Sequence, residues 1–238
     1  IQDIKASWLE CNPQTTPGFS SVAYYFGRDL QKALGVPVGL IHTSWGGSPA
    51  EVWMGDEVLK SNPDYQRDIL DSYQGQFKKY QDELARWEQE EAALKKEGKK
   101  PGRNKPNPGW KPAELYNGMI APLIPCAIKG AIWYQGESNA GRARQYRTLF
   151  PDLIRNWRKD WGQGDFTFLA VQLAPWDKNK KRSLESITES PGESDWAELR
   201  EAQLLAAQTM PKVGMAVITD AGDKDDIHPV KKEPVGAR

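Results

Sequence analysis

Short apolar runs alternate with helical segments along this chain, and this order restricts the fold more than any other feature. The apolar runs cover residues 38–42, 127–134, 166–173 and 213–219. Each run is almost continuously apolar, which is typical of strands buried on both faces of a sheet. Segments with apolar residues at helical spacing, at 18–34, 144–161 and 196–210, separate these runs. We therefore predict an α/β protein whose mostly parallel sheet carries helices on both faces.

One charged segment interrupts this alternation. Residues 56–100 are rich in Glu, Gln and Lys, and an apolar stripe at helical spacing runs through them: Tyr73, Phe77, Tyr80, Leu84 and Trp87. The stripe predicts a long amphipathic helix lying on the surface, with its charges on a solvated face. A Pro-, Gly- and Lys-rich linker at 99–112 then returns the chain to the core.

Composition excludes several classes of function. The 238 residues suffice for one large α/β domain or two small ones. A formal net charge of zero offers no electrostatic footprint for nucleic acid or an acidic membrane. No apolar run approaches the roughly 20 residues of a membrane helix. Cys11 and Cys126 do not suggest a disulfide scaffold; they could pair, but two separately buried thiols are expected. Neither metal-ligand spacing nor a phosphate-binding loop is present, so we expect no metal and no cofactor.

Three of the predicted strands lead directly into loops of small or reactive residues. These loops are 44–47, 135–139 and 220–228. The carboxyl ends of parallel strands meet at one edge of a sheet, which is where open α/β sheets bind their ligands. We therefore predict one site built from the three loops.

The chain has only two histidines as candidates for a catalytic base. His42 lies inside an apolar run, where core packing is expected. His228 lies in a loop of carboxylates, and Asp225 precedes it by three residues. An Asp that orients an imidazole is part of a nucleophilic triad, and Asp226 is an alternative to Asp225 in that role. A solvated histidine in an acidic surface loop explains this block equally well.

The other two loops offer hydrogen-bond donors. Gly46 and Gly47 would let backbone N–H groups approach a ligand, as an oxyanion hole requires, although a tight turn explains them equally well. Asn139 would add a side-chain amide donor. Gln135 and Glu137 would orient the loop or contact substrate, or would cap a turn or serve as a buried carboxylate. Such donors beside an Asp–His pair indicate acyl transfer through a tetrahedral intermediate.

Neither candidate serine satisfies the usual pattern for a nucleophile. Ser44 ends an apolar run, but the residues around it lack the first glycine of a nucleophile elbow. Ser138 would require one short loop to supply both the nucleophile and an oxyanion donor.

Five blocks together resemble the sialate O-acetylesterase-like branch of the SGNH hydrolases, which includes acetylxylan-esterase-like proteins. They are residues 22–28, 36–51, 115–123, 133–140 and 225–229. The resemblance implies one three-layer α/β/α domain over 1–238, with a mostly parallel, flavodoxin-like sheet and a helical insertion at about 56–112. It implies an enzyme that removes acetyl esters from sugars, with Asp225 and His228 in its triad. It also implies oxyanion donors at Gly46, Gly47 and in the 135–139 loop. Trp45, next to the turn, is a further candidate for contacting substrate or orienting the loop.

The chain departs from this family pattern at the nucleophile. The family's serine lies in a Gly-Gln-Ser-Asn type block after the first strand, and this sequence has no such block. We therefore expect residues 1–238 to be an esterase domain truncated at both ends, with an N-terminal segment of the same protein as a partner that supplies the nucleophile and a central strand. The resemblance further implies an acetylated carbohydrate substrate and export from the cell.

Two alternatives follow from the absent serine block. In one, a serine hydrolase uses Ser44 together with Asp225 and His228. In the other, the protein is a non-catalytic carbohydrate-binding relative, and four tryptophans line its groove: Trp45, Trp53, Trp133 and Trp176.

Overall fold

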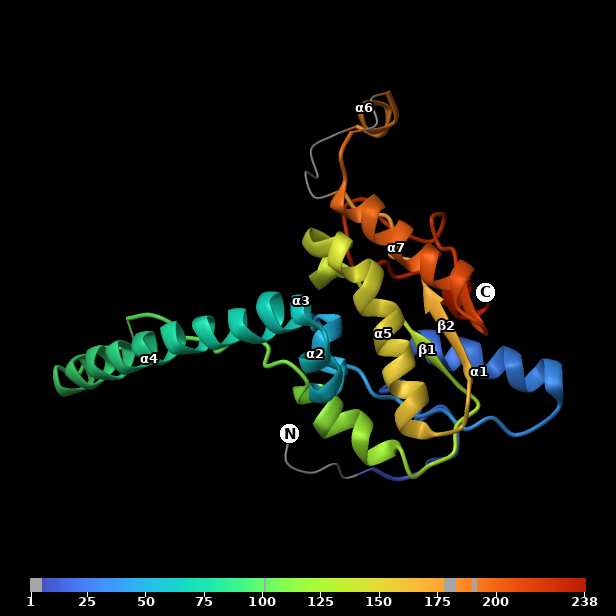
Figure 1. The fold of residues 1–238 in the computed structure, drawn as a ribbon, viewed down its shortest axis with the longest axis horizontal. Coiled ribbons are helices and arrows are strands. Elements are labelled where there is room, and N and C mark those ends of the chain that lie inside the picture. The colour runs from blue at the N-terminus through green and yellow to red at the C-terminus, as the bar shows by residue number, and fades with distance from the viewer. Residues whose placement is uncertain (1–5, 101, 178–182, 190–191) are drawn as a thin grey trace.

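A parallel three-stranded sheet forms the centre of the computed structural model, which describes residues 6–100, 102–177, 183–189 and 192–238 (Figure 1). Its strands lie in the order β1 (Gly130–Trp133), β2 (Thr167–Val171) and β3 (Val213–Ala216). Gly130 pairs with Thr167, and Phe168 pairs with Val213. Parallel neighbours need crossover connections, and the helices α5 (Ala143–Trp161) and α7 (Asp195–Thr209) lie in these connections. The predicted α/β fold is confirmed.

Helices pack on both faces of this sheet. α5 and α7 lie against each other and bury the larger core, in which Trp133 meets Trp157 edge to face with ring centroids 5.7 Å apart. The inner face predicted for α5 is buried, namely Tyr146, Leu149, Leu153 and Trp157. α1 (Ser21–Leu34) and the short α8 (Glu233–Gly236) contact each other beside a second, smaller core of Val171, Ala174, Ile218, Ala221 and Val235.

The ends of α1 follow from local chemistry. The Ser20 side chain accepts a hydrogen bond from Ala23 N and caps the first turn. Gly35 ends the helix in the left-handed conformation, with φ of 66°, which suits glycine. The prediction of a helix that stops at Gly35 is confirmed.

Residues 38–42 are not a strand, so this prediction was wrong. They have no strand partner within the part of the chain that the structure describes, and Val36 and Ile41 are exposed. β1 pairs on one side with β2, and Ile132 on β1 is 38% exposed. Apolar periodicity describes one segment, whereas a strand also needs a neighbour to complete its hydrogen bonds.

The charged segment forms several helices instead of one. α2 (Asp56–Ser61) and α3 (Pro63–Tyr65) lead through the π-helix η2 (Gln66–Asp71) into α4 (Ser72–Lys96). Pro63 begins a new helix behind the Asn62 cap, because proline lacks the N–H that would continue α2. The predicted long helix with solvated charges is present as α4, which has no buried residue. It projects from the body as an arm, so the prediction that it lies on the body was wrong (Figure 1). The returning chain lies along the arm, and Trp87 Nε1 donates to Arg103 O at 3.0 Å.

Short elements complete the described chain. They are η1 (Ala50–Trp53), η3 (Tyr116–Ile120), η4 (Ala121–Leu123), η5 (Glu137–Arg142) and α6 (Leu184–Glu189). Among the described residues, no helix combines the length and the apolar character needed to cross a membrane. Cys11 and Cys126 are free, and both are exposed, so their expected burial was wrong.

Candidate active site

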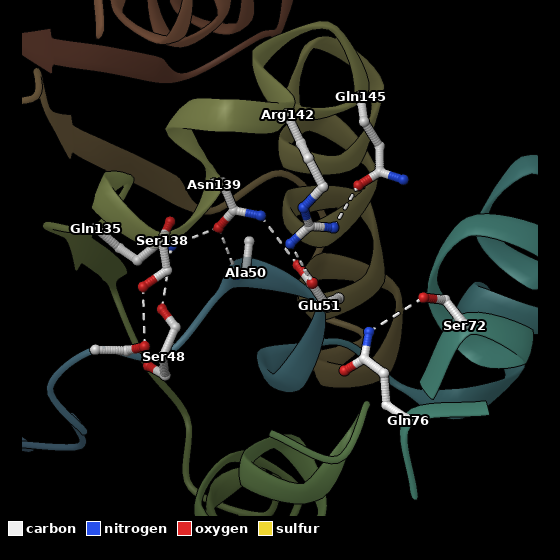
Figure 2. A network of polar contacts seen from close by, with 11 residues as sticks. Ser48, Ala50, Glu51, Ser72, Gln76, Gln135, Ser138, Asn139, Arg142 and Gln145 are labelled. Atoms are coloured by element: carbon white, nitrogen blue, oxygen red, sulfur yellow. Dashed lines mark hydrogen bonds and ion pairs between the residues drawn. The ribbon is translucent and has the colours of Figure 1, made fainter. Parts of the chain in front are cut away.

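Two of the three predicted loops are joined by hydrogen bonds at the carboxyl end of β1 (Figure 2). Gln135 Nε2 donates to Ser48 O at 3.2 Å, and Ser138 Oγ donates to Gly47 O at 2.9 Å. These bonds bring the Gly46–Gly47 turn against the 135–139 loop across about 90 residues of sequence. The sequence predicted that the two loops would meet, although residues 38–42 do not join the sheet.

A buried polar network fixes the relative position of these loops (Figure 2). Asn139 Oδ1 accepts from Ala50 N at 2.8 Å and from Gln135 Nε2 at 2.7 Å, while its amide nitrogen donates to Glu51 at 3.0 Å. Arg142 donates to the other Glu51 oxygen at 2.5 Å. Glu51 is 7% exposed, and a buried carboxylate needs such a cationic partner. Sequence reasoning missed Glu51 and Arg142 as site residues; a carboxylate inside the apolar run 50–54 was the available signal.

Hydrogen bonds of Gln135 attach the 135–139 loop to α5 and α7. Its Oε1 accepts from the Tyr146 hydroxyl at 3.0 Å, and its backbone oxygen accepts from Gln203 Nε2 at 3.0 Å. Complete burial raises the pKa of Tyr146 well above its usual value, so this hydroxyl stays a donor. Gln135 therefore orients the loop, which is one of the two roles expected of it. Glu137 is partly exposed beside it, and its role stays a prediction.

The Gly46–Gly47 turn is exposed and conformationally specific. Gly47 has φ of 74°, a region that favours glycine. A Cβ atom at either glycine would meet no other atom within 4 Å, so a ligand could approach the backbone closely. The oxyanion role of these two glycines stays a prediction. The oxyanion role of Asn139 also stays a prediction; the residue is 1% exposed, and its amide nitrogen donates to Glu51 at 3.0 Å.

The His228 loop places a different carboxylate beside the imidazole than the one predicted. His228 Nδ1 lies 3.9 Å from Asp226 Oδ1, which also accepts from His228 N at 2.8 Å. Asp225 instead pairs with Lys224 at 2.6 Å. Asp226 is thus the better placed of the two alternatives, because a carboxylate two residues before His228 reaches that residue's own N–H. The triad role of Asp225 stays a prediction.

Lys232 connects this loop to the 135–139 loop. Its ammonium group lies 5.5 Å from the centre of the Tyr134 ring. Burial lowers the pKa of Lys232, while the carboxylates of Glu137 and Asp226 raise it in part. Lys232 is therefore near one carboxylate from each loop. Ala221 at the start of the third loop belongs to the smaller core against which Tyr134 packs, so this loop lies near the 135–139 loop. The His228 side chain itself is largely exposed, at 87%.

Ser44 forms a pair that the sequence did not reveal. Its Oγ lies 2.6 Å from His42 Nε2, and the His42 ring packs edge to face on Phe19 at 5.1 Å. Both residues of the pair are exposed, so the expected core position of His42 was wrong. Residues i and i+2 of an extended segment point to the same side, and this spacing was the signal available in the sequence.

The tryptophans do not line a common groove. Trp53 and Trp133 are 3% and 7% exposed and pack edge to face at 6.1 Å inside the larger core. Trp176 packs on Trp196 at 4.9 Å. Trp45 is exposed at the first loop. Among the described residues, no group of three or more His, Cys, Asp or Glu could hold a metal ion.

The arrangement of these loops coincides with a match to a known protein family. Residues 103–232, more than half of the chain, match the family model described as "carbohydrate esterase, sialic acid-specific acetylesterase". The chain belongs to this family. The resemblance seen in the sequence motifs is confirmed, and the matched region includes both the 135–139 loop and the His228 loop.

Relatives agree with the family match and extend beyond this chain. The sialate O-acetylesterases of Homo sapiens and Mus musculus are 31% and 32% identical to it over 231 and 237 residues. Each alignment covers 92% of this chain, but 37% and 41% of the relative. A crystal structure of a carbohydrate acetylesterase from Xanthomonas citri matches with a TM-score of 0.72 at 31% identity, covering 99% of this chain and 44% of that one. The chain thus spans about two fifths of the length of these relatives.

Proposed function

We propose that this chain carries the acid–base and oxyanion part of a carbohydrate O-acetylesterase, which removes acetyl esters from sugars. The observation that carries the proposal is the hydrogen bonding of the Gly46–Gly47 turn to the 135–139 loop, together with the packing of the 220–228 loop near Tyr134. The names of the relatives support an O-acetylated sugar, such as an O-acetylated sialic acid, as substrate. Family analogy also supports export of the protein to reach extracellular glycans, which cell fractionation would test.

The proposed reaction is acyl transfer in two steps. A serine hydroxyl attacks the acetyl carbonyl and passes its proton to His228, and the tetrahedral oxyanion faces the N–H groups of the Gly46–Gly47 turn. The C–O bond to the sugar then breaks, and the sugar oxygen receives the proton from His228. Water attacks the acetyl-serine with His228 as base, which releases acetate and restores the serine. A carboxylate of the 225–226 pair orients the imidazole and stabilises its charged form.

We place the nucleophile on a segment outside these 238 residues. Ser138 Oγ donates to Gly47 O, and Ser44 pairs with His42, so neither is paired with His228. Among the described residues, the outer edge of β1 has no strand partner, and residues 38–42 have none either. A strand that paired with both would complete their backbone hydrogen bonds and could carry a serine to the carboxyl edge.

A second candidate keeps the reaction and changes the nucleophile. The distance of 2.6 Å between Ser44 Oγ and His42 Nε2 is that of a serine activated by an imidazole base. In this version Ser44 attacks the acetyl group beside the adjacent Gly46–Gly47 turn. The binding-protein alternative has less support, because two of its four groove tryptophans are buried in the core.

Labelling with a fluorophosphonate tests both versions. The complete protein and the 238-residue chain are treated with the probe, and the modified serine is mapped by mass spectrometry, with Ser44→Ala as the matched control. Our proposal expects labelling of the complete protein at a serine outside this chain, with loss of labelling in His228→Ala. Labelling at Ser44 that depends on His42 would establish the second candidate. A folded, complete protein that hydrolyses no acetyl ester would contradict both.

A further inference from the structure

Two tryptophans from separate segments form an aromatic corner next to the candidate site. The Trp45 and Trp110 rings lie 6.3 Å apart between centroids, at an interplanar angle of 87°. Trp45 immediately precedes the Gly46–Gly47 turn and is 51% exposed. Trp110 comes from the segment that returns from the α4 arm, and it packs partly buried against the larger core. The corner therefore joins the site to the inserted segment.

The backbone that carries Trp45 is held on both sides. Trp45 O accepts from Ser48 Oγ at 2.7 Å, and Ser48 Oγ itself accepts from the buried Trp53 indole at 2.8 Å. On the other side, Thr43 Oγ1 donates to Met119 O at 3.3 Å. An exposed indole on a fixed backbone loses little conformational entropy when a ligand binds, so it is a preorganised contact surface.

The chemistry of this corner fits a sugar ring. Ligand sites combine aromatic walls with a few polar groups, and an indole presents a large flat apolar face together with one N–H donor. A pyranose has an apolar face of C–H groups surrounded by hydroxyls, so it can stack on one indole while its edge meets the other. If the acetyl group of a substrate is held at the Gly46–Gly47 turn, the sugar to which it is attached lies beside Trp45, which immediately precedes the turn.

We propose that Trp45 and Trp110 form the platform that binds the sugar ring of the acetylated substrate. The inference rests on the proposed esterase function and assigns its substrate contact. Trp110 acts both as the second wall and as a support for Trp45. The returning segment of the arm thus contributes a specificity-determining residue.

The test compares a sugar ester with a small ester on the complete enzyme. The probes are an O-acetylated xylo-oligosaccharide, an O-acetylated sialic acid and 4-nitrophenyl acetate. Trp45→Ala should raise KM for at least one sugar ester about tenfold more than KM for the aryl acetate, which corresponds to about 1.4 kcal/mol. Trp45→Phe should restore most of the loss, because it keeps an aromatic face. Trp8→Ala is the matched control, since Trp8 is also an exposed indole, at 68%, and packs near Gly39 instead of the turn.

Failures of the two proposals are distinguishable. If the wild type hydrolyses the aryl acetate and Trp45→Ala impairs all three esters equally, Trp45 shapes the turn and the platform is refuted. If the wild type hydrolyses no ester, the esterase proposal fails. In that case the platform is tested by sugar binding alone. Calorimetry measures the affinity of the deacetylated sugars for His228→Ala and for the same variant with Trp45→Ala, and equal affinities would refute the platform. Trp110→Leu is measured alongside, since it keeps an apolar side chain against the core but removes the aromatic face. Sugar affinity equal to that of the parent protein would refute the role of Trp110 as the second wall.

Discussion

Replacing Asn139 tests whether the buried network holds the candidate site together. Asn139→Ala removes the acceptor for Ala50 N, a fully buried group, and one of the donors to Glu51. A buried N–H without a partner costs about 1–3 kcal/mol, and a lost hydrogen bond to a charged group costs about 1.5–3 kcal/mol. Gln135 Nε2 loses Asn139 as an acceptor but keeps its hydrogen bond to Ser48 O, so this loss adds little to the cost in stability. We expect the free energy of unfolding to fall by about 3 kcal/mol, or roughly a hundredfold in the equilibrium constant.

Asn139→Asp separates shape from charge at the same position. The new carboxylate could still accept from Ala50 N and Gln135 Nε2, but it would lie beside the Glu51 carboxylate. Two adjacent carboxylates raise the pKa of one of them in the folded state. The penalty is therefore absent below the unfolded pKa of about 4 and grows as pH rises, by at most about 1.4 kcal/mol per pH unit.

Urea unfolding followed by tryptophan fluorescence measures both variants, at pH 7 for the alanine and from pH 4.5 to 8 for the aspartate. Asn117→Ala, on an exposed side chain, is the control and should stay within about 0.5 kcal/mol of wild type. An Asn139→Ala cost below about 1 kcal/mol would refute the reasoning. So would an Asn139→Asp variant whose stability tracks that of the wild type across the pH range.

Three further predictions address other parts of the molecule. Asp226→Asn should lower kcat for an acetyl ester in the complete enzyme by two orders of magnitude or more, and Asp225→Asn by less than tenfold, because Asp226 lies beside the imidazole; equal losses would contradict this. Gly136→Ala should destabilise the protein by about 1–3 kcal/mol in urea unfolding, because a Cβ there would overlap a buried leucine of α7. Arg238 lowers the pKa of Asp220 to about 2, so this carboxylate contributes stability above pH 4 that is lost as pH falls towards 2. In an NMR titration, Arg238→Gln should return the pKa of Asp220 towards its usual value, and an unchanged pKa would refute the pairing.

Sequence patterns best predicted the elements that combine a regular spacing of apolar residues with a residue that marks the end of the element. α5 shows this, because its four inner residues recur at helical spacing and Gly162 follows its last turn. The strands β1, β2 and β3 are apolar runs that lead into loops of small or polar residues. All three have parallel partners in the structure. Local patterns therefore recovered the α/β order and the edge at which the loops meet.

Features that depend on distant partners were not predicted. The stripe on α4 shows which face of the helix is covered but not by what, and the covering group is the returning chain at Arg103. The Glu51–Asn139 bond joins residues 88 positions apart, and no spacing rule connects such residues. The choice between Asp225 and Asp226 also depends on loop geometry, because both are within reach in sequence.

The two errors on residues 38–42 have a common physical origin. The run was expected to pair in the sheet and to bury His42, and it does neither. Its apolar composition is that of a strand covered on both faces, and an exposed run of this kind is unfavourable by itself. The same holds for the outer edge of β1, where Ile132 is 38% exposed. Both segments precede loops that are already held together through Ser48 and Gln135, so a strand between them would face the same site. The strand that we proposed above as the carrier of the nucleophile would therefore also cover both of these apolar segments.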